Sequence, residues 1–354
     1  MRVLSIGTDR KLFDERSAVF VRHMMYARAL GKMDIIVFSL LGHHEPTPGI
    51  ERGPLRIVAT NSRHRLLYGW DAIRIARRLV RPDVVSVQDP FETGLVGFLI
   101  ARMLRVPLHV QVHTDFLSPA FVTLSFLNRI RVSIAGFVLR RASRTRVVSE
   151  RIKLGIEKRY RLHTPITILP IFVDVGRFKQ VFGEPALSEQ LARFKTKLLV
   201  VSRLEPEKNV ALAIRAFARS APQDACLTIL GTGSQRHMLE TLARELKVSD
   251  RVFFEERGDP ALYYKFTDLV LFPSRYDGYG MVIVEALAAG KPVLSTDVGI
   301  AREAGAVIAS EGKFGEALSE WFKSGQRTGG LKTYPYRDSN EYVKAYCEDI
   351  TAAV

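Results

Sequence analysis

Four charged residues stand at positions where two predicted strands of the C-terminal half give way to turns. Arg203 and Lys208 follow a strand predicted over Lys197–Val201, and Asp277 and Glu285 follow a second buried strand. Two cations a few residues apart at the carboxyl end of a strand are well placed to neutralise a diphosphate. These residue types therefore indicate a site for a phosphorylated ligand.

The segment from Leu269 to Gly299 carries the most specific pattern, a strand, a glycine-containing loop and a helix. Gly278 and Gly280 allow the backbone to approach a ligand closely, and free N–H groups at the helix start favour an anion. Glu285 lies in an apolar stretch of that helix, where a carboxylate is costly unless something hydrogen-bonds to it. Ribose hydroxyls would do so. The plainer interpretation makes Asp277 a helix cap and Glu285 a solvent-facing residue.

A third segment, Leu227–Glu240, reads as a strand, a Gly-Thr-Gly turn and a helix. A lone G-x-G turn is weak evidence of a phosphate site, and here its glycines are also explained by close packing.

Together the three segments resemble glycosyltransferase family 4, a group of retaining enzymes with the GT-B fold. The closest part is Glu285–Val293, which reads EALAAGKPV, and the resemblance is specific from about Lys197 to Glu303. Over the rest of the chain it is looser and includes Pro82-Asp83-Val84, a histidine at a strand end, Val148-Ser149 and the stretch LPIFVDVGRF.

The resemblance implies roles for individual residues. Glu285 would bind the donor ribose, Arg203 and Lys208 the diphosphate, and Asp277 the transferred sugar, which His113 would approach from the other domain. The residues with a catalytic role would be His113, Asp277, Arg203 and Lys208. Donor contacts would come from Arg203, Lys208, Gly278, Tyr279, Gly280, Met281, Val282 and Glu285. The family retains the anomeric configuration without a covalent enzyme nucleophile, and fixed cations with helix-terminal amides would replace a metal at the leaving diphosphate. No metal and no cofactor is therefore expected.

The sequence departs from the family's pattern at three places. Asp277 stands where a Glu is usual, the segment Asp9–Phe20 replaces a Gly-Gly loop, and Phe172-Val173 replaces Asn-Gly. A single histidine at a strand end, such as His113, is also often a core or loop residue. The aromatic residues of this half are expected to pack against the sheet, and Asp268 is expected to be structural. These aromatic residues are Tyr263, Tyr264 and Phe266.

Short runs rich in Val and Ile alternate with helical stretches along the whole chain, which is typical of parallel α/β sheets. We expect two Rossmann-like domains with parallel sheets facing across a cleft, over residues 1–180 and 181–335. Residues 336–354 should form a helix that packs back on the N-terminal domain, and Pro170–Phe182 should be the linker. The expected strands are Arg2–Ile6, Asp34–Ser39, Val84–Gln88, Leu108–His113, Arg146–Val148, Thr167–Leu169, Lys197–Val201, Leu227–Leu230, Val252–Phe254, Leu269–Phe272 and Val293–Ser295. The expected helices include Val21–Leu30 and Arg74–Val80.

Composition excludes several classes of protein. The 354 residues, 47% of them hydrophobic and 25% charged, suit two globular domains. Two distant cysteines make neither a disulfide framework nor a metal cluster, so a reduced, cytoplasmic compartment is expected. The start MRVLSIG reads as a strand rather than a signal peptide. The longest uncharged run, Phe116–Asn128, is shorter than the roughly 20 residues that span a bilayer.

The net charge of +15 comes entirely from the N-terminal half, where Met1–Pro170 holds 28 Lys+Arg against 13 Asp+Glu. Ile171–Val354 holds 24 of each. Such a field favours an anionic partner, although a merely solvated basic surface would also account for it. One predicted helix carries an arginine stripe opposite an apolar side formed by Trp70, Ile73, Ala76 and Val80. That stripe consists of Arg74, Arg77, Arg78 and Arg81. A second stretch contains Arg129, Arg131, Arg140, Arg141, Arg144 and Arg146, with Ile130, Ile134, Phe137 and Val138 between them.

These features predict a protein peripheral to the cytoplasmic face of an anionic membrane, with a lipid-linked or membrane-presented glycan acceptor. Nucleic acid is an unlikely partner, since no aromatic platform accompanies the basic residues. Two alternatives stay open. One is a nucleotide-sugar epimerase of the same fold, and the other a non-catalytic relative that binds anions through its basic half.

Overall fold

The computed structural model describes residues 1–42, 48–179 and 189–354, which form two compact units. The first unit comprises Met1–Pro170 together with Tyr336–Val354, and the second comprises Ile171–Pro335. The first break in the chain thus falls after residue 170, where the sequence had suggested residue 180. The end of the expected linker, residues 180–182, lies outside the described residues, and its middle forms a short helix, α7 (Val175–Lys179).

The first unit is built on an eight-stranded sheet in the order β3-β4-β2-β1-β5-β6-β7-β8. Its strands are β1 (Arg2–Gly7), β2 (Lys32–Val37), β3 (Ile50–Arg52), β4 (Leu55–Ala59), β5 (Val84–Val87), β6 (Leu108–Val112), β7 (Arg144–Val147) and β8 (Ile166–Ile168). β1, β2, β5 and β6 are almost wholly buried. That burial explains their near-continuous apolar runs, because parallel strands are covered on both faces.

The sheet of the first unit is parallel, as expected, except at one edge. β3 pairs with β4 antiparallel through a turn at Gly53, whose φ is 55°, and neither strand was expected from the sequence. β3 is short and carries two exposed charged residues, Glu51 and Arg52, so it lacks the apolar run that marks the buried strands.

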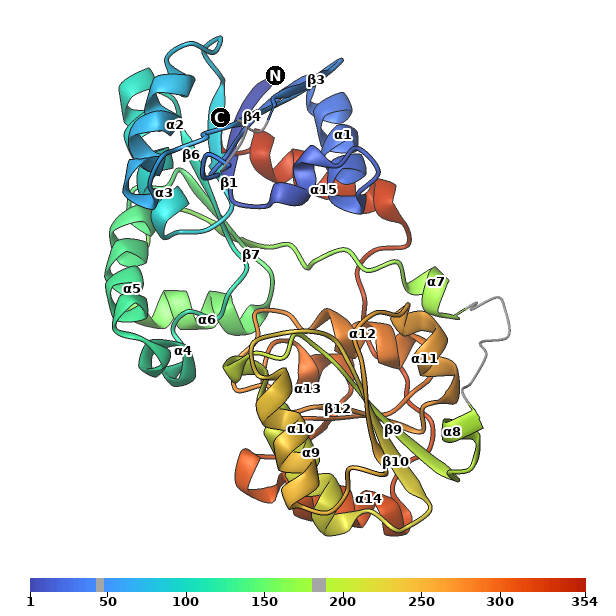
Figure 1. Cartoon of the computed structure of the whole chain (residues 1–354). Coiled ribbons are helices and arrows are strands. Elements are labelled where there is room, and N and C mark those ends of the chain that lie inside the picture. Colours follow the sequence, from blue (N-terminus) through green and yellow to red (C-terminus); the bar gives the residue numbers. More distant parts are fainter. Residues whose placement is uncertain (43–47, 180–188) are drawn as a thin grey trace. The chain divides into compact units, whose positions relative to one another are not determined.

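Helices cover both faces of this sheet (Figure 1). α1 (Ala18–Leu30) packs against α15 (Ser339–Thr351), while α2 (Tyr68–Ala76), α3 (Glu92–Leu104) and α5 (Phe126–Leu139) pack side by side. α4 (Pro119–Leu124) leads directly into α5, and α6 (Glu150–Arg159) follows β7.

The helix expected over Arg74–Val80 is misplaced. α2 begins six residues earlier, at Tyr68, and ends at Ala76, after which the chain turns toward β5. The arginine stripe at positions 74, 77, 78 and 81 therefore does not run along one helix. Of the apolar residues predicted opposite it, Ala76 is buried, whereas Trp70 and Val80 are 62% and 64% exposed and do not pack into the core.

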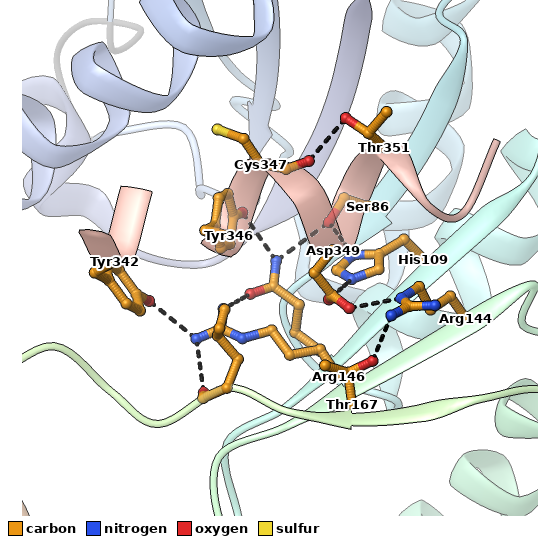
Figure 2. A network of polar contacts seen from close by, with 12 residues as sticks. Ser86, His109, Arg144, Arg146, Thr167, Tyr342, Tyr346, Cys347, Asp349 and Thr351 are labelled. Atoms are coloured by element: carbon orange, nitrogen blue, oxygen red, sulfur yellow. Dashed lines mark hydrogen bonds and ion pairs between the residues drawn. The ribbon is translucent and has the colours of Figure 1, made fainter. Parts of the chain in front are cut away.

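A buried polar network fastens α15 to the sheet of the first unit (Figure 2). Asp349 on α15 accepts hydrogen bonds from His109 Nε2 (2.9 Å) and Arg144 Nε (2.6 Å). His109 Nδ1 lies 2.9 Å from the Ser86 hydroxyl. Burial is the largest influence on the pKa of His109 and lowers it, so the ring is neutral and its Nε2–H donates to Asp349. The return of the chain from the second unit is thus held by specific contacts.

The second unit is built on a six-stranded parallel sheet in the order β11-β10-β9-β12-β13-β14. Its strands are β9 (Thr196–Val201), β10 (Ala225–Leu230), β11 (Val252–Glu255), β12 (Leu269–Phe272), β13 (Val293–Ser295) and β14 (Val307–Ile308). The short edge strand β14 was not expected. The helices that cover this sheet include α9 (Val210–Ser220), α10 (Arg236–Glu245), α11 (Pro260–Phe266), α12 (Met281–Ala288), α13 (Ala301–Ala304) and α14 (Phe314–Ser324).

One face of this sheet packs with α9, α10 and α14 around a core that includes Phe217, Leu239 and Phe314. α11, α12 and α13 occupy the other face (Figure 1). Since β9 and β12 are parallel neighbours, the loops that follow them meet at the same edge of the sheet.

Candidate functional site

Two of the predicted site residues meet at the carboxyl edge of the second unit's sheet. Lys208 lies in the turn after β9 and Asp277 in the loop after β12. The Lys208 Nζ lies 2.6 Å from Asp277 Oδ2, and the two side chains are only 15% and 18% exposed. The pairing follows from the parallel register of the two strands, and it joins a cation to the first acid of the predicted motif.

The loop after β12 is shaped by Asp277 and Gly280. The Tyr279 N–H donates to Asp277 Oδ1 at 3.1 Å, so this carboxylate organises the turn rather than capping the helix. Gly280 is the N-terminal cap residue of α12 with φ 90°, a conformation that favours glycine, and no side chain caps the helix there. Tyr279 is buried, so only its backbone is placed for a ligand, while Met281 is exposed at the helix start.

Glu285 lies on α12, half-buried, and its Oε2 accepts a hydrogen bond from the Tyr264 hydroxyl at 3.0 Å. Burial raises the pKa of Glu285, although the Tyr264 hydrogen bond acts in the opposite direction. Tyr264 itself is fully buried on α11 and packs edge-on against Phe178. The expected packing of Tyr264 is confirmed, but its hydrogen bond to Glu285 was not foreseen, because nothing near residue 264 in the sequence indicates it.

The two glycines of the Gly-Thr-Gly turn are required by close packing against the loop after β9. A Cβ on Gly231 would lie 1.9 Å from the Ser202 carbonyl oxygen, and one on Gly233 would lie 2.4 Å from that of Leu204. These glycines therefore let the turn press against the loop that carries Arg203. At the start of α10, Glu205 accepts hydrogen bonds from the Ser234 N–H and hydroxyl, so a protein carboxylate already occupies that position.

Arg203 lies apart from the Lys208 contact and remains largely in solvent. Its Nη2 pairs with Glu207 Oε1 at 2.9 Å, and its side chain is 69% exposed. To contact a ligand at the same edge of the sheet, Arg203 would have to leave Glu207.

His113 belongs to the first unit and follows directly after β6, so the strand expected to include it ends one residue earlier. Its ring is half-buried, and burial followed by the charges of Arg146 and Arg22 lowers its pKa to about 3. The imidazole is therefore neutral near pH 7. It lies on the same face of β6 as His109 and Gln111, because alternate residues of a strand share a face.

Three residues of the two predicted basic stretches are held by contacts within the first unit. Arg81 donates to the carbonyl oxygens of Leu104 and Arg105 at the end of α3. In the second stretch, Arg146 is fully buried and bonds Gln111, and Arg144 pairs with Asp349. Arg144 and Arg146 alternate along β7, so both side chains lie on the face that α15 covers. The periodicity of one segment does not predict which helix covers that face.

The described residues contain no cluster of His, Cys, Asp and Glu that could hold a metal ion. Nor is any helix within residues 1–42, 48–179 and 189–354 long and apolar enough to cross a membrane.

Two family models match the chain in regions that correspond to its two units. The model described as "Glycosyltransferase Family 4" matches residues 21–177, and the one described as "Glycosyl transferases group 1" matches residues 186–307.

Curated relatives with similar sequences include enzymes named for lipid and for small-molecule glycosylation. An alpha-monoglucosyldiacylglycerol synthase of Streptococcus pneumoniae is 26% identical over 63% of this chain and 54% of its own length. The synthase of the same name from Acholeplasma laidlawii is 25% identical over 71% of this chain and 68% of its own. The alpha-D-kanosaminyltransferase of Streptomyces kanamyceticus is 28% identical over 72% of this chain and 69% of its own. The match to the first of these relatives thus spans about half of that protein.

Solved structures share the whole fold at low sequence identity. HepE of Anabaena in complex with UDP-glucose superposes with a TM-score of 0.70, at 19% identity and over 97% of its chain. Sucrose-phosphate synthase of Thermosynechococcus elongatus gives a TM-score of 0.74 at 17% identity, over 96% of its chain.

Proposed function

Because the chain belongs to the glycosyltransferases with the GT-B fold, we propose that it moves a sugar from a nucleoside diphosphate to a hydroxyl of a lipid-linked or membrane-presented acceptor. We propose further that the anomeric configuration is retained and that no metal is needed. The observation that carries the donor half of this proposal is the meeting of Lys208, Asp277 and the α12 N-terminus at one sheet edge.

The leaving diphosphate would gain its stabilisation from this edge. Negative charge grows on the departing oxygen during transfer, and preorganised donors that face it lower the barrier. Lys208 and Arg203 supply positive charge, and the uncapped first turn of α12 supplies backbone N–H groups with a favourable dipole.

The two carboxylates would orient the rest of the donor. Glu285 is held by Tyr264 through Oε2, which leaves its second oxygen for a ribose hydroxyl. Asp277 accepts a hydrogen bond from the Lys208 ammonium group. Its carboxylate could also accept hydrogen bonds from hydroxyls of the transferred sugar. UDP and UDP-glucose bound to HepE support a donor of this class.

The acceptor side of the proposal depends on charge. The first structural unit holds 30 Lys+Arg against 17 Asp+Glu, so it keeps nearly all of the positive excess. An anionic membrane surface attracts such a unit, and each cation near the surface contributes about 1 kcal/mol. The lipid-acting names of two relatives support an acceptor at a membrane. We propose a peripheral location on its cytoplasmic face.

A ligand panel tests the donor assignment directly. Thermal unfolding would be followed with uridine and guanosine diphosphates and their sugars, first with a chelator and then with Mg²⁺ or Mn²⁺ in excess of it. A ligand at about 100 times its dissociation constant adds about 2.7 kcal/mol of stability. Mass spectrometry of the products and the anomeric coupling constant in NMR then report transfer and retention. Binding that appears only after Mg²⁺ or Mn²⁺ is added would overturn the metal-independent assignment.

A further inference from the structure

Six exposed apolar side chains lie at one edge of the first unit, where soluble proteins usually place polar residues. Leu66, Leu67 and Trp70 precede or begin α2, and Leu124, Phe126 and Leu127 form the corner between α4 and α5. Leu66, Trp70 and Phe126 are 87%, 62% and 74% exposed. We call these six residues the apolar rim.

Both parts of the apolar rim lie at the carboxyl edge of the sheet. Before the first part of the rim, Ser62 forms a bridge with Leu40, which lies beyond the end of β2, so α2 starts at the carboxyl edge. After α2 the chain reaches Arg81, which donates to the carbonyl oxygen of Leu104 at the end of α3. The ends of α2 and α3 therefore lie together at the other edge. At the second part, Arg131 of α5 pairs with Glu92, the first residue of α3. The three helices therefore start at the same edge.

This edge also carries His113. The connection that leaves β6 begins with His113 and runs through α4 into the corner of Phe126 and Leu127. A membrane that held this corner would thus also constrain the connection that begins with His113, the candidate catalytic residue.

The rim is presented by a fixed framework. At the α4–α5 corner, the buried Asn128 donates its Nδ2 to the Phe121 carbonyl at 2.8 Å, and Ser125 caps α5. At α2, the Ser62 hydroxyl donates to Asp71 at 2.6 Å. The backbone is thus held by hydrogen bonds at both parts of the rim, and the apolar side chains are exposed on an ordered framework.

Arginines flank both parts of the rim. Arg63 and Arg65 precede Leu66, and Arg129 follows Leu127, and all three are exposed. Among the described residues no carboxylate pairs with any of them. Exposed apolar tips bordered by unpaired cations are complementary to an anionic bilayer, which offers phosphate outside and hydrocarbon beneath.

We propose that the apolar rim inserts into the headgroup region of an anionic bilayer and holds the His113 edge against it. The proposal rests on the proposed function only for its lipid acceptor, since insertion itself needs no donor. It differs from attraction by charge alone, because it requires Trp70 and Phe126 to leave water.

The two tryptophans of the chain make insertion measurable. Trp70 belongs to the rim, whereas Trp321 is buried on α14 in the second unit and donates to the Gln326 carbonyl. The full chain would be mixed with phosphatidylcholine vesicles, with and without phosphatidylglycerol, carrying bromine on the acyl chains. We expect quenching only with the anionic lipid, and its loss in Trp70→Phe, which keeps Trp321 as the sole emitter.

A pair of matched variants separates insertion from surface attraction. Replacing Phe126 and Leu127 by Ser should weaken vesicle binding about tenfold or more, because each buried side chain of this size contributes to transfer from water. Val80→Ser removes an equally exposed apolar group at the opposite edge of the same unit and should leave binding unchanged. Unquenched Trp70 in vesicle-bound protein, equal effects of the two changes, or no binding to anionic vesicles would each overturn the proposal.

A separate measurement of nucleoside diphosphate binding, made without vesicles, distinguishes a failure of this proposal from a failure of the proposed function. Insertion without any nucleotide binding would overturn the function alone. Nucleotide binding without insertion would overturn the rim alone.

Discussion

Replacing Asp277 by Asn should tighten the binding of a nucleoside diphosphate while it slows sugar transfer. In the unliganded protein Lys208 is bound to Asp277 at 2.6 Å, so a diphosphate must compete with that carboxylate for the same ammonium group. Asn keeps Oδ1, which accepts from the Tyr279 N–H, and the loop should therefore keep its shape.

The expected gain can be worked out from the burial of the pair. A charge-assisted hydrogen bond contributes about 1.5–3 kcal/mol, whereas an exposed ion pair contributes well under about 1 kcal/mol. With side chains 15% and 18% exposed, the Lys208–Asp277 pair lies between these limits. Release of about 1 kcal/mol corresponds to roughly fivefold tighter binding.

Isothermal titration calorimetry with a nucleoside diphosphate measures the affinity, and a transfer assay measures the rate. Asp224→Asn is the matched control, because it makes the same change in the same unit at the exposed Lys195–Asp224 pair. A folded Asp277→Asn protein with unchanged or weaker nucleotide affinity would refute the competition, and with it the diphosphate role of Lys208.

Three further outcomes are expected. Glu285→Gln should weaken the binding of nucleosides and nucleotides alike by about 1.5–3 kcal/mol, whereas Lys208→Ala should weaken the binding of only those ligands that carry a diphosphate. An equal loss of affinity for a plain nucleoside in the two variants would contradict these roles. Gly231→Ala should lower the free energy of unfolding by about 2–4 kcal/mol, since its Cβ would meet the Ser202 oxygen at 1.9 Å and φ is +149°; chemical denaturation measures this. Acidification below about pH 6.5 should destabilise the first unit, because burial lowers the pKa of His109 in the fold while the unfolded ring still takes up a proton. Burial opposes ionisation of Asp349, but His109 and Arg144 hold its pKa below the usual value. A second loss of stability should therefore follow below about pH 4. Thermal unfolding measured over a series of pH values would show both losses.

The sequence predicted the elements that its own periodicity marks. The strands from β5 to β13 lie within two residues of their expected ends. Most of them are short apolar runs bounded by polar residues, whereas β7 carries two arginines. β3, β4 and β14 were missed. β3 and β14 are short edge strands, and Arg56 interrupts the apolar residues of β4. The boundaries of α2 were misjudged because the arginine spacing of 74, 77, 78 and 81 suggested a helix that continues past Val80, whereas α2 ends at Ala76.

Partners were harder to predict than positions. The sequence placed Lys208 and Asp277 at the ends of strands, but only the sheet order, with β9 next to β12, brings them into contact. The Tyr264–Glu285 hydrogen bond joins α11 to α12 across the packed face of the sheet, and no spacing in the sequence encodes it. The same limit hid the burial of Arg146, which a count of basic residues had assigned to the surface.

The internal pairing of charges bears on donor selectivity under the proposed function. Arg203 is paired with Glu207 and Lys208 with Asp277, so neither cation is available at no cost. A neutral nucleoside offers no charge that could replace these carboxylates, and a single phosphate replaces one of them poorly. A diphosphate carries enough charge to engage both cations, and the hydroxyls of an attached sugar can then satisfy the Asp277 carboxylate that Lys208 has left. The pairing therefore favours the complete nucleotide sugar over any of its fragments.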